Sequence, residues 1–233
     1  MVYRLYLLIF LPILVFGVNL DTIAKKIYQN ECGSNPKNLI HWNKGESFAS
    51  LGIGHFIWYS KKNQEKFVES FPPLIEFLEQ NGVKVPNWLK KNSPWNNKNE
   101  MNLDPRYDKL KKFLIDTMDL QAKFMSKRLE KSLPDLVSVN ISFQRVTNTK
   151  NGYYPLIDYL NFKGLGNSDK ERYRGEGWGL IQVLKCMPNK GDAKSEFREC
   201  AKFVLKNRVK NSPPSRNEKR WLKGWYNRID SYI

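Results

Sequence analysis

A stretch near the middle of the chain, residues 107–133, constrains the fold more than any other feature. The positions that recur every three or four residues, and so share one face of a helix, are Leu110, Phe113, Leu114, Met118, Gln121, Phe124, Met125 and Leu129. This spacing predicts one long amphipathic helix. Its basic residues, Arg128 among them, are expected on the solvated face. Such a helix must bury its apolar face against other elements, which favours a mainly α-helical protein.

The composition of the chain indicates a single globular domain, which we expect to span residues 18–233. The 233 residues are 41% hydrophobic and include 7 Trp, 11 Tyr and 13 Phe, more apolar surface than a disordered chain carries. Residues 59–105 contain aromatic segments with proline, such as Phe71-Pro-Pro and Ser93-Pro-Trp95. They are predicted to form an irregular insertion with one short helix near residues 74–81. Because Gly and Ser do not dominate there, no linker or second domain is predicted.

The N-terminus and the charge of the chain bear on location and partner. A basic start at residues 1–4 precedes an apolar run at residues 5–16, so residues 1–17 are predicted to be a signal peptide, with an uncleaved signal anchor as the alternative. The run is short for a transmembrane helix, and no stable membrane insertion is expected after cleavage. The formal net charge of +16 predicts an anionic partner. Nucleic acid, an anionic membrane surface and acidic cell-wall polymer all fit this charge. For an exported protein, periplasmic or secreted, nucleic acid is not expected as a partner, which leaves the membrane surface and the anionic wall polymer.

The three cysteines and two histidines limit the available chemistry. Cys186 and Cys200 can pair in an oxidising compartment, which leaves Cys32 as the free thiol. Cys32 is either a nucleophile or a small residue buried at a helix end. The second interpretation is favoured because neither His41 nor His55 has an evident partner acid. The spacing of these residues matches no metal site, so neither a metal nor a cofactor is predicted.

Glu31 is the strongest candidate for a catalytic acid. It closes an apolar stripe at helical spacing, and Gly33 follows as a helix stop. A carboxyl group at the end of a buried stripe, near the negative end of the helix dipole, has a raised pKa and can donate a proton. The alternative is that Glu31 turns to the rim or pairs with a Lys or Arg. Glu46 follows in a polar loop, and two acids a short loop apart are the minimum requirement of a glycoside hydrolase.

The segment that contains these acids resembles the catalytic segment of phage-type lysozymes. Glu31 and the polar loop with Glu46 precede the glycine-containing hairpin Ser50-Leu-Gly-Ile-Gly-His55. In that family a helix-terminal Glu is followed by an acid and a Thr-Ile-Gly-Ile-Gly-His hairpin. The resemblance implies that Glu31 is the proton donor and that Ser50 positions the attacking water. Glu46 stands near the family's Asp, although its spacing to the hairpin is shorter and the residue type differs. The hairpin histidine, His55, would be structural and lie at the substrate side.

Two later segments match the same family in the same order. Asn161-Phe-Lys-Gly164-Leu-Gly166 resembles its Asn-x-Gly-x-Gly turn with one extra residue, and Arg208 to Arg216 follow its Arg-x-x-Asn-x-x-Pro-x-Arg pattern. Gly179-Leu-Ile-Gln182 instead resembles the Gly-Leu-Met-Gln of lytic transglycosylases. We therefore expect substrate contacts from five side chains: Trp42, His55, Asn161, Gln182 and Arg216. Trp42 could equally pack in the core. Asp158 and Lys163 can reach the cleft, and Glu176 is an alternative second carboxylate.

The resemblance implies a fold and an activity. The fold would be α+β, mainly α, and lysozyme-like, with a small β-hairpin lobe and a helical lobe joined by the helix at residues 107–133. The activity would be that of a muramidase: hydrolysis of β-1,4 bonds in peptidoglycan by a monomer without a cofactor, with Glu31, Glu46 and Ser50 as catalytic residues. Two alternatives stay open, a lytic transglycosylase that uses Glu31 alone and a non-catalytic module that binds cell wall. Chitin or chitosan is a lesser variant of the substrate.

Overall fold

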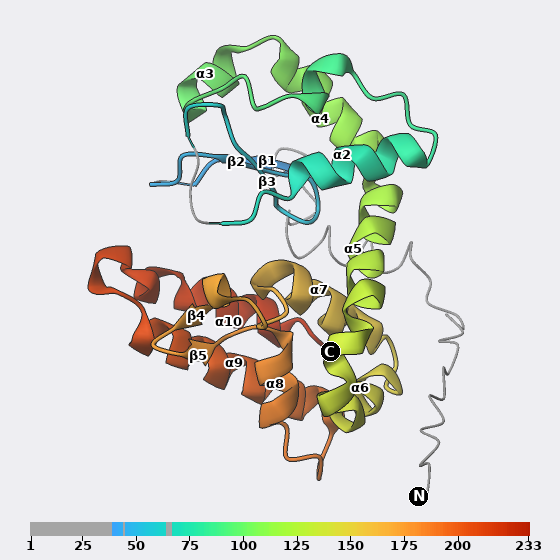
Figure 1. Ribbon diagram of the computed structural model, residues 1–233, viewed down its shortest axis with the longest axis vertical. Coiled ribbons are helices and arrows are strands. Elements are labelled where there is room, and N and C mark those ends of the chain that lie inside the picture. The colour runs from blue at the N-terminus through green and yellow to red at the C-terminus, as the bar shows by residue number, and fades with distance from the viewer. Residues whose placement is uncertain (1–38, 44, 64–66) are drawn as a thin grey trace, which may run out of the picture.

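The computed structural model describes residues 39–43, 45–63 and 67–233, which form two lobes joined by a helix (Figure 1). The protein is mainly helical with a small antiparallel sheet, as predicted. The described residues between 39 and 116 form the sheet lobe, residues 133–233 form the helical lobe, and α5 (Met118–Ser132) runs between them. The predicted signal peptide, Glu31 and Cys32 lie outside the described residues. Within these residues, every helix is too short or too polar to cross a membrane.

A three-stranded antiparallel sheet in the order β1-β2-β3 is the base of the sheet lobe. Its strands are β1 (Ile40–His41), β2 (Ala49–Leu51) and β3 (Phe56–Trp58). The predicted glycine hairpin is present: β2 and β3 pair directly, and residues 52–55 form the turn. Gly52 has φ +67°, and a Cβ at this position would overlap the side-chain oxygen of Gln121. The turn therefore needs glycine both for its backbone angle and for the close approach of α5.

The Pro-rich segment at residues 59–105 packs against this sheet and is more helical than predicted. It contains α2 (Phe71–Gln80), η2 (Asn87–Lys90) and α3 (Lys98–Leu103), and α4 (Arg106–Asp116) follows it. Only a helix near the position of α2 was predicted. The rings of Phe71, Trp88 and Trp95 lie 4.9, 6.0 and 5.8 Å from that of Trp58 in β3. These aromatic contacts give the segment its own apolar packing.

The prediction of one continuous helix over residues 107–133 is wrong at Thr117, where α4 ends and α5 begins. Thr117 has φ −117°, and its hydroxyl donates a hydrogen bond to the Phe113 carbonyl at 2.8 Å. Gln121, fully buried, donates from Nε2 to the Leu114 carbonyl at 2.8 Å and to Thr117 Oγ1 at 3.0 Å. Its Oε1 accepts from the Ile53 amide at 3.0 Å. Gln121 stabilises the break because its amide group pairs the Leu114 carbonyl and the Thr117 hydroxyl there and ties both to the hairpin through Ile53.

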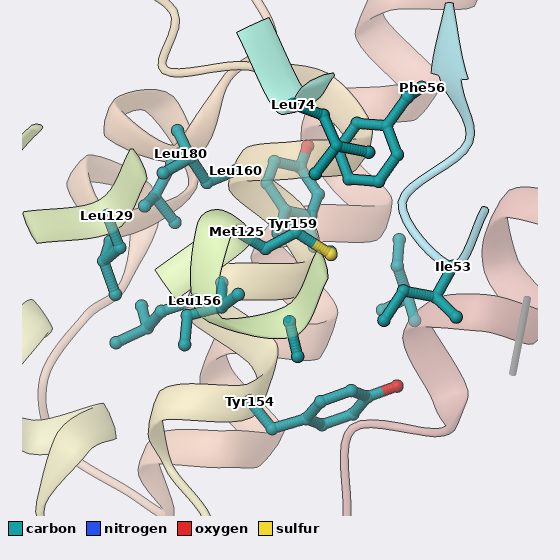
Figure 2. Packing of buried hydrophobic residues seen from close by; sticks show 14 of the residues in the cluster. Ile53, Phe56, Leu74, Met125, Leu129, Tyr154, Leu156, Tyr159, Leu160 and Leu180 are labelled. Carbon is teal, nitrogen blue, oxygen red and sulfur yellow. The ribbon is translucent and has the colours of Figure 1, made fainter. Parts of the chain in front are cut away.

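The helical lobe is built around α7, which is buried on nearly all sides. The elements of this lobe are η3 (Leu133–Val139), α6 (Asn140–Thr147), α7 (Tyr153–Lys163), η4 (Asp169–Glu171), β4 (Arg172–Tyr173), β5 (Glu176–Gly177), α8 (Leu180–Cys186), α9 (Ala193–Asn211), η5 (Pro214–Arg216), η6 (Glu218–Trp221) and α10 (Leu222–Asp230). Figure 2 shows Met125 and Leu129 of α5 in one apolar cluster with Leu156 and Leu160 of α7. The linking helix is thus part of the core of this lobe.

Two cross-links fix the remaining helices of the helical lobe. Cys186 and Cys200 form a disulfide between α8 and α9, with their Cα atoms 5.6 Å apart. Asp158 of α7, fully buried, accepts two bonds of 2.8 Å from Arg228 of α10 and one of 2.6 Å from the Tyr232 hydroxyl. Asp158 was expected to reach a cleft, but these partners enclose it. Burial, and then the neighbouring Asp158 charge, raises the pKa of Tyr232 well above its ordinary value.

Candidate functional site

A cleft of about 430 Å³ lies between the two lobes and is lined by residues from both. Five of the side chains selected from the sequence line it: Glu46, Ser50, His55, Asn161 and Lys163. The first three come from the sheet lobe and the other two from α7, so segments far apart in the sequence meet at one cavity. The volume is within the range of small-ligand sites.

Glu46 is held at the cleft by a tight polar loop. Its amide donates to the Asn43 carbonyl at 3.2 Å, and Asn43 Nδ2 donates to the Glu46 carboxylate at 2.9 Å. Trp42 supports the loop from below, because its indole Nε1 donates to the Glu46 carbonyl at 2.8 Å. Trp42 is buried and does not line the cleft. The alternative of core packing therefore describes Trp42 better than sugar stacking does.

Ser50 and His55 reach the cleft from the hairpin. Ser50 lies at the centre of β2, opposite His41 on β1 and Ile57 on β3, and only 7% of its surface is exposed. The sheet thus fixes the direction of its hydroxyl. His55 ends the turn with φ +48°, a left-handed conformation that His tolerates better than most side chains. Burial, and then the nearby His55, lowers the pKa of His41.

Arg128 and Asn161 form a polar pair on the helical side of the cleft. Arg128 Nη1 donates to Asn161 Oδ1 at 2.7 Å, and Asn161 Nδ2 donates to the Ile157 carbonyl at 2.8 Å. Burial lowers the pKa of Arg128, while the charge of Glu171 acts in the opposite direction. Arg128 was predicted on a solvated face, and this prediction is wrong: the side chain is partly buried and lines the cleft. The sequence pattern could not show that Asn161 lies opposite it.

Glu171 is a cleft-lining carboxylate that the sequence analysis missed. Its carboxylate accepts a hydrogen bond from the Gly166 amide. A Cβ on Gly164, whose φ is +86°, would overlap the same carboxylate. Of the two glycines noted in the sequence, Gly164 leaves room for the Glu171 carboxylate and Gly166 donates its amide to it. These glycines were the only local signal for Glu171. Glu176, the alternative acid chosen from the sequence, is exposed on β5 and does not line the cleft.

Gln182 and Arg216 support the site from outside the lining. Gln182 Oε1 accepts from the Gly179 amide at 2.9 Å, and its Nε2 donates to the Gly166 carbonyl at 3.1 Å. These bonds tie the start of α8 to the turn that holds Glu171. The Arg216 guanidinium donates at 3.0 Å to Glu218. Both residues were expected to contact substrate; in the structure both have intramolecular partners and neither lines the cleft, and the contact with substrate stays a prediction.

Glu218 is a buried carboxylate that holds Arg208 at the wall of the cleft. It is 1% exposed and accepts from Arg208 Nε at 2.7 Å and from the Tyr173 hydroxyl at 2.8 Å. Burial alone would raise the pKa of Glu218, but the hydrogen bond and charge of Arg208 outweigh it and lower the pKa to about 2. Glu218 is therefore ionised at any physiological pH and holds Arg208 against the cleft.

Cationic side chains lie over aromatic rings on the helical side of the cleft. The Lys163 ammonium lies 3.4 Å from the centroid of the Trp225 ring, and the Arg208 guanidinium lies 4.2 Å from that of Trp178. All four side chains line the cavity. Such cation–π contacts fix the orientation of the rings. The wall of the cleft therefore combines aromatic rings with positive charge.

The comparisons with known proteins do not add to this geometry. No family model, no curated protein and no solved structure matches the chain. Within residues 39–43, 45–63 and 67–233, no group of three or more His, Cys, Asp or Glu side chains is placed to hold a metal ion. The function of the protein is therefore inferred from the cleft and from the sequence motifs that contribute to it.

Proposed function

We propose that this protein is a muramidase-like glycoside hydrolase with a lysozyme-like fold, nearest the phage type, that cleaves β-1,4 bonds of peptidoglycan. One observation carries the proposal. Glu46 and Ser50, from the first sequence motif, line the same interlobe cavity as Asn161, from the second. Those residues were selected from sequence alone, and more than a hundred residues of chain separate the two motifs. Their meeting at one cleft is what a shared active site requires.

In this proposal Glu31 protonates the leaving glycosidic oxygen. Glu46 orients or deprotonates a water molecule, and the Ser50 hydroxyl helps to position that water. The sheet holds Ser50 and the loop hydrogen bonds hold Glu46, so both groups are pre-oriented before substrate binds. A wide separation of the Glu31 and Glu46 carboxyls, with room for water, would give inversion at the anomeric carbon. A short separation would give retention.

The charge of the chain supports an anionic wall polymer as the substrate. The formal net charge of +16 attracts such a polymer, and added salt weakens attraction between exposed charges. This polymer lies outside the cytoplasm, in keeping with the signal peptide predicted at residues 1–17. We propose that the mature protein acts there as a monomer and without a cofactor.

The test is digestion of purified peptidoglycan, with the soluble products identified by mass spectrometry. We expect the parent protein to release muropeptides with reducing ends. Glu31→Gln should lower the rate by at least roughly a hundredfold, because a general acid contributes that much or more. Glu46→Gln should also slow the reaction. Glu176→Gln is the matched control, since Glu176 is exposed and outside the cleft lining, and its rate should equal that of the parent.

The products separate the alternatives. Anhydro sugars, with Glu46 dispensable, would indicate a lytic transglycosylase that uses Glu31 alone. Binding to the wall with no soluble product from a folded parent protein would indicate a non-catalytic module. Full activity in Glu31→Gln would refute the assignment of the proton donor.

A further inference from the structure

The helical side of the cleft carries more positive charge than its local structure uses. Among the residues that the structure describes, two carboxylates line the cavity, Glu46 and Glu171. The described cationic side chains that line it are Arg128, Lys163, Lys170, Arg208 and Arg228. Two of these five have buried carboxylate partners: Arg208 bonds Glu218 at 2.7 Å, and Arg228 bonds Asp158 at 2.8 Å. The positive charges of Arg208 and Arg228 are therefore largely neutralised by these buried carboxylates.

Arg128 differs from those two cations. Its side chain is partly buried, and within the described part of the chain no carboxylate oxygen lies within the 4.0 Å ion-pair distance. The polar group that meets it is the neutral Asn161 amide, whose Oδ1 accepts from Nη1 at 2.7 Å. A guanidinium has five N–H donors, so donors remain after this bond. A partly desolvated guanidinium without an ion pair is costly in isolation and gains from an added anion.

The carboxylate whose charge acts on Arg128, that of Glu171, has a different hydrogen-bond partner. Glu171 influences Arg128 electrostatically, but its own hydrogen bond comes from the Gly166 amide. Lys170, the residue before it, lines the same cavity, is exposed, and has no ion pair among the described residues. Its long stem can swing toward a bound group. The cleft thus presents a fixed guanidinium and a movable ammonium on one side.

We propose that Arg128 and Lys170 bind a carboxylate carried by the substrate, so that the cleft selects glycans with carboxylates over neutral glycans. The inference rests on the proposed function and adds the chemical class that the cavity prefers. An arginine fork matches the two oxygens of a carboxylate, and a lysine adds a point charge. In peptidoglycan the carboxylate comes either from the lactyl ether of the sugar or from the stem peptide. The two sources share the same chemistry at the binding site.

Calorimetric titration of three tetrasaccharides tests the proposal without depending on turnover. One is a neutral chitotetraose, one carries free lactyl carboxylates without stems, and one carries stem peptides. The proteins are the parent, Arg128→Gln, Lys170→Gln, and the control Lys185→Gln, an exposed lysine of α8 outside the cleft lining. Glu31→Gln in each background keeps the ligands intact. The same proteins are assayed on peptidoglycan in parallel.

We expect the parent and Lys185→Gln to bind at least one carboxylate-bearing ligand about tenfold more tightly than chitotetraose, the effect of one charge-assisted contact. Arg128→Gln should abolish this preference and leave chitotetraose binding unchanged, Lys170→Gln should reduce it, and Arg128→Lys should restore part of it. If the Arg128→Gln protein loses affinity for the ligand with free lactyl carboxylates, the carboxylate comes from the sugar. If it loses affinity for the ligand with stem peptides, the carboxylate comes from the stem. Because Lys170 is exposed, its variant carries the test even if Arg128→Gln fails to fold.

Two results would overturn the proposal. One is a parent protein that binds none of the ligands or binds all three equally. The other is a preference that survives in folded Arg128→Gln and Lys170→Gln. A carboxylate preference without any cleavage of peptidoglycan would refute the proposed hydrolase and leave this binding site supported.

Discussion

Replacing Gln121 with leucine should destabilise the protein far more than the loss of one surface amide would. Gln121 is fully buried, and its three hydrogen bonds join the Ile53 amide of the hairpin to Leu114 and Thr117 at the α4–α5 break. Leucine is similar in size but can neither donate nor accept. The substitution therefore removes three bonds at once and leaves the Ile53 amide buried without an acceptor.

The expected cost can be built from these contacts. Leaving the buried Ile53 amide unpaired costs about 2 kcal/mol, and each of the two bonds donated by Gln121 contributes about 1 kcal/mol. The apolar surface of the new leucine offsets about 1 kcal/mol of this loss. We expect the free energy of unfolding to fall by about 3 kcal/mol, a large share of the 5–15 kcal/mol typical of native proteins.

Urea denaturation followed by tryptophan fluorescence measures this change. The matched control is Gln144→Leu, the same substitution at an exposed position of α6, which should change stability by less than about 0.5 kcal/mol. The m value should stay constant, because the surface exposed on unfolding is nearly the same. If Gln121→Leu differs from the control by less than about 1 kcal/mol, the buried network does not stabilise the fold in the way argued.

Three further predictions concern stability. Replacing Cys186 and Cys200 together with serine removes a cross-link across a sequence separation of 14 and should lower the unfolding free energy by about 3 kcal/mol, measured in urea; an unchanged midpoint would contradict this. The stabilisation that Glu218 provides through its depressed pKa is complete above about pH 4.5 and is lost as the pH falls toward about 2. In Glu218→Gln the urea midpoint should therefore fall less between pH 5 and 2 than it does in the parent protein. Equal slopes of midpoint against pH in the two proteins would argue against this role. Gly175→Ala, at φ +80°, should lower the free energy of unfolding by roughly 1 kcal/mol, and Gly166→Ala, at φ +91°, should lower it by more. The reason is that a neighbouring side-chain oxygen and the backbone crowd a Cβ at Gly166 but not at Gly175. Equal melting temperatures of the two variants would refute this.

The parts of the fold that follow from local patterns were predicted correctly. The glycine hairpin and the helix near residues 74–81 each have a signal within a few residues, and both are present. The break at Thr117 has no such signal, because helical spacing continues through it. It depends on Gln121 and on the Ile53 amide, which is 68 residues away in sequence from Gln121. The aromatic packing of residues 59–105 around Trp58 is likewise a tertiary effect.

The candidate site divides in the same way. Side chains chosen from motifs, such as Ser50 and Asn161, do line the cleft. Gln182 was chosen from a motif as well, but its side chain bonds a neighbouring turn and does not line the cleft. The sequence alone does not tell a glutamine that lines a cleft from one that bonds a turn. Arg128 and Glu171 were missed because their setting is created by Asn161 and by the Gly166 amide. Glu31, on which the proposed chemistry depends most, lies outside the described residues and stays a prediction.

The bond between Ile53 and Gln121 also has a consequence for synthesis on the ribosome. The chain emerges from its N-terminus, so the sheet and its hairpin are made well before α5. Until position 121 leaves the exit tunnel, the Ile53 amide lacks its partner and the apolar face of the hairpin lacks its cover. The sheet lobe therefore cannot reach its native state as an early nascent chain. Its maturation must wait for the helix that begins the second lobe.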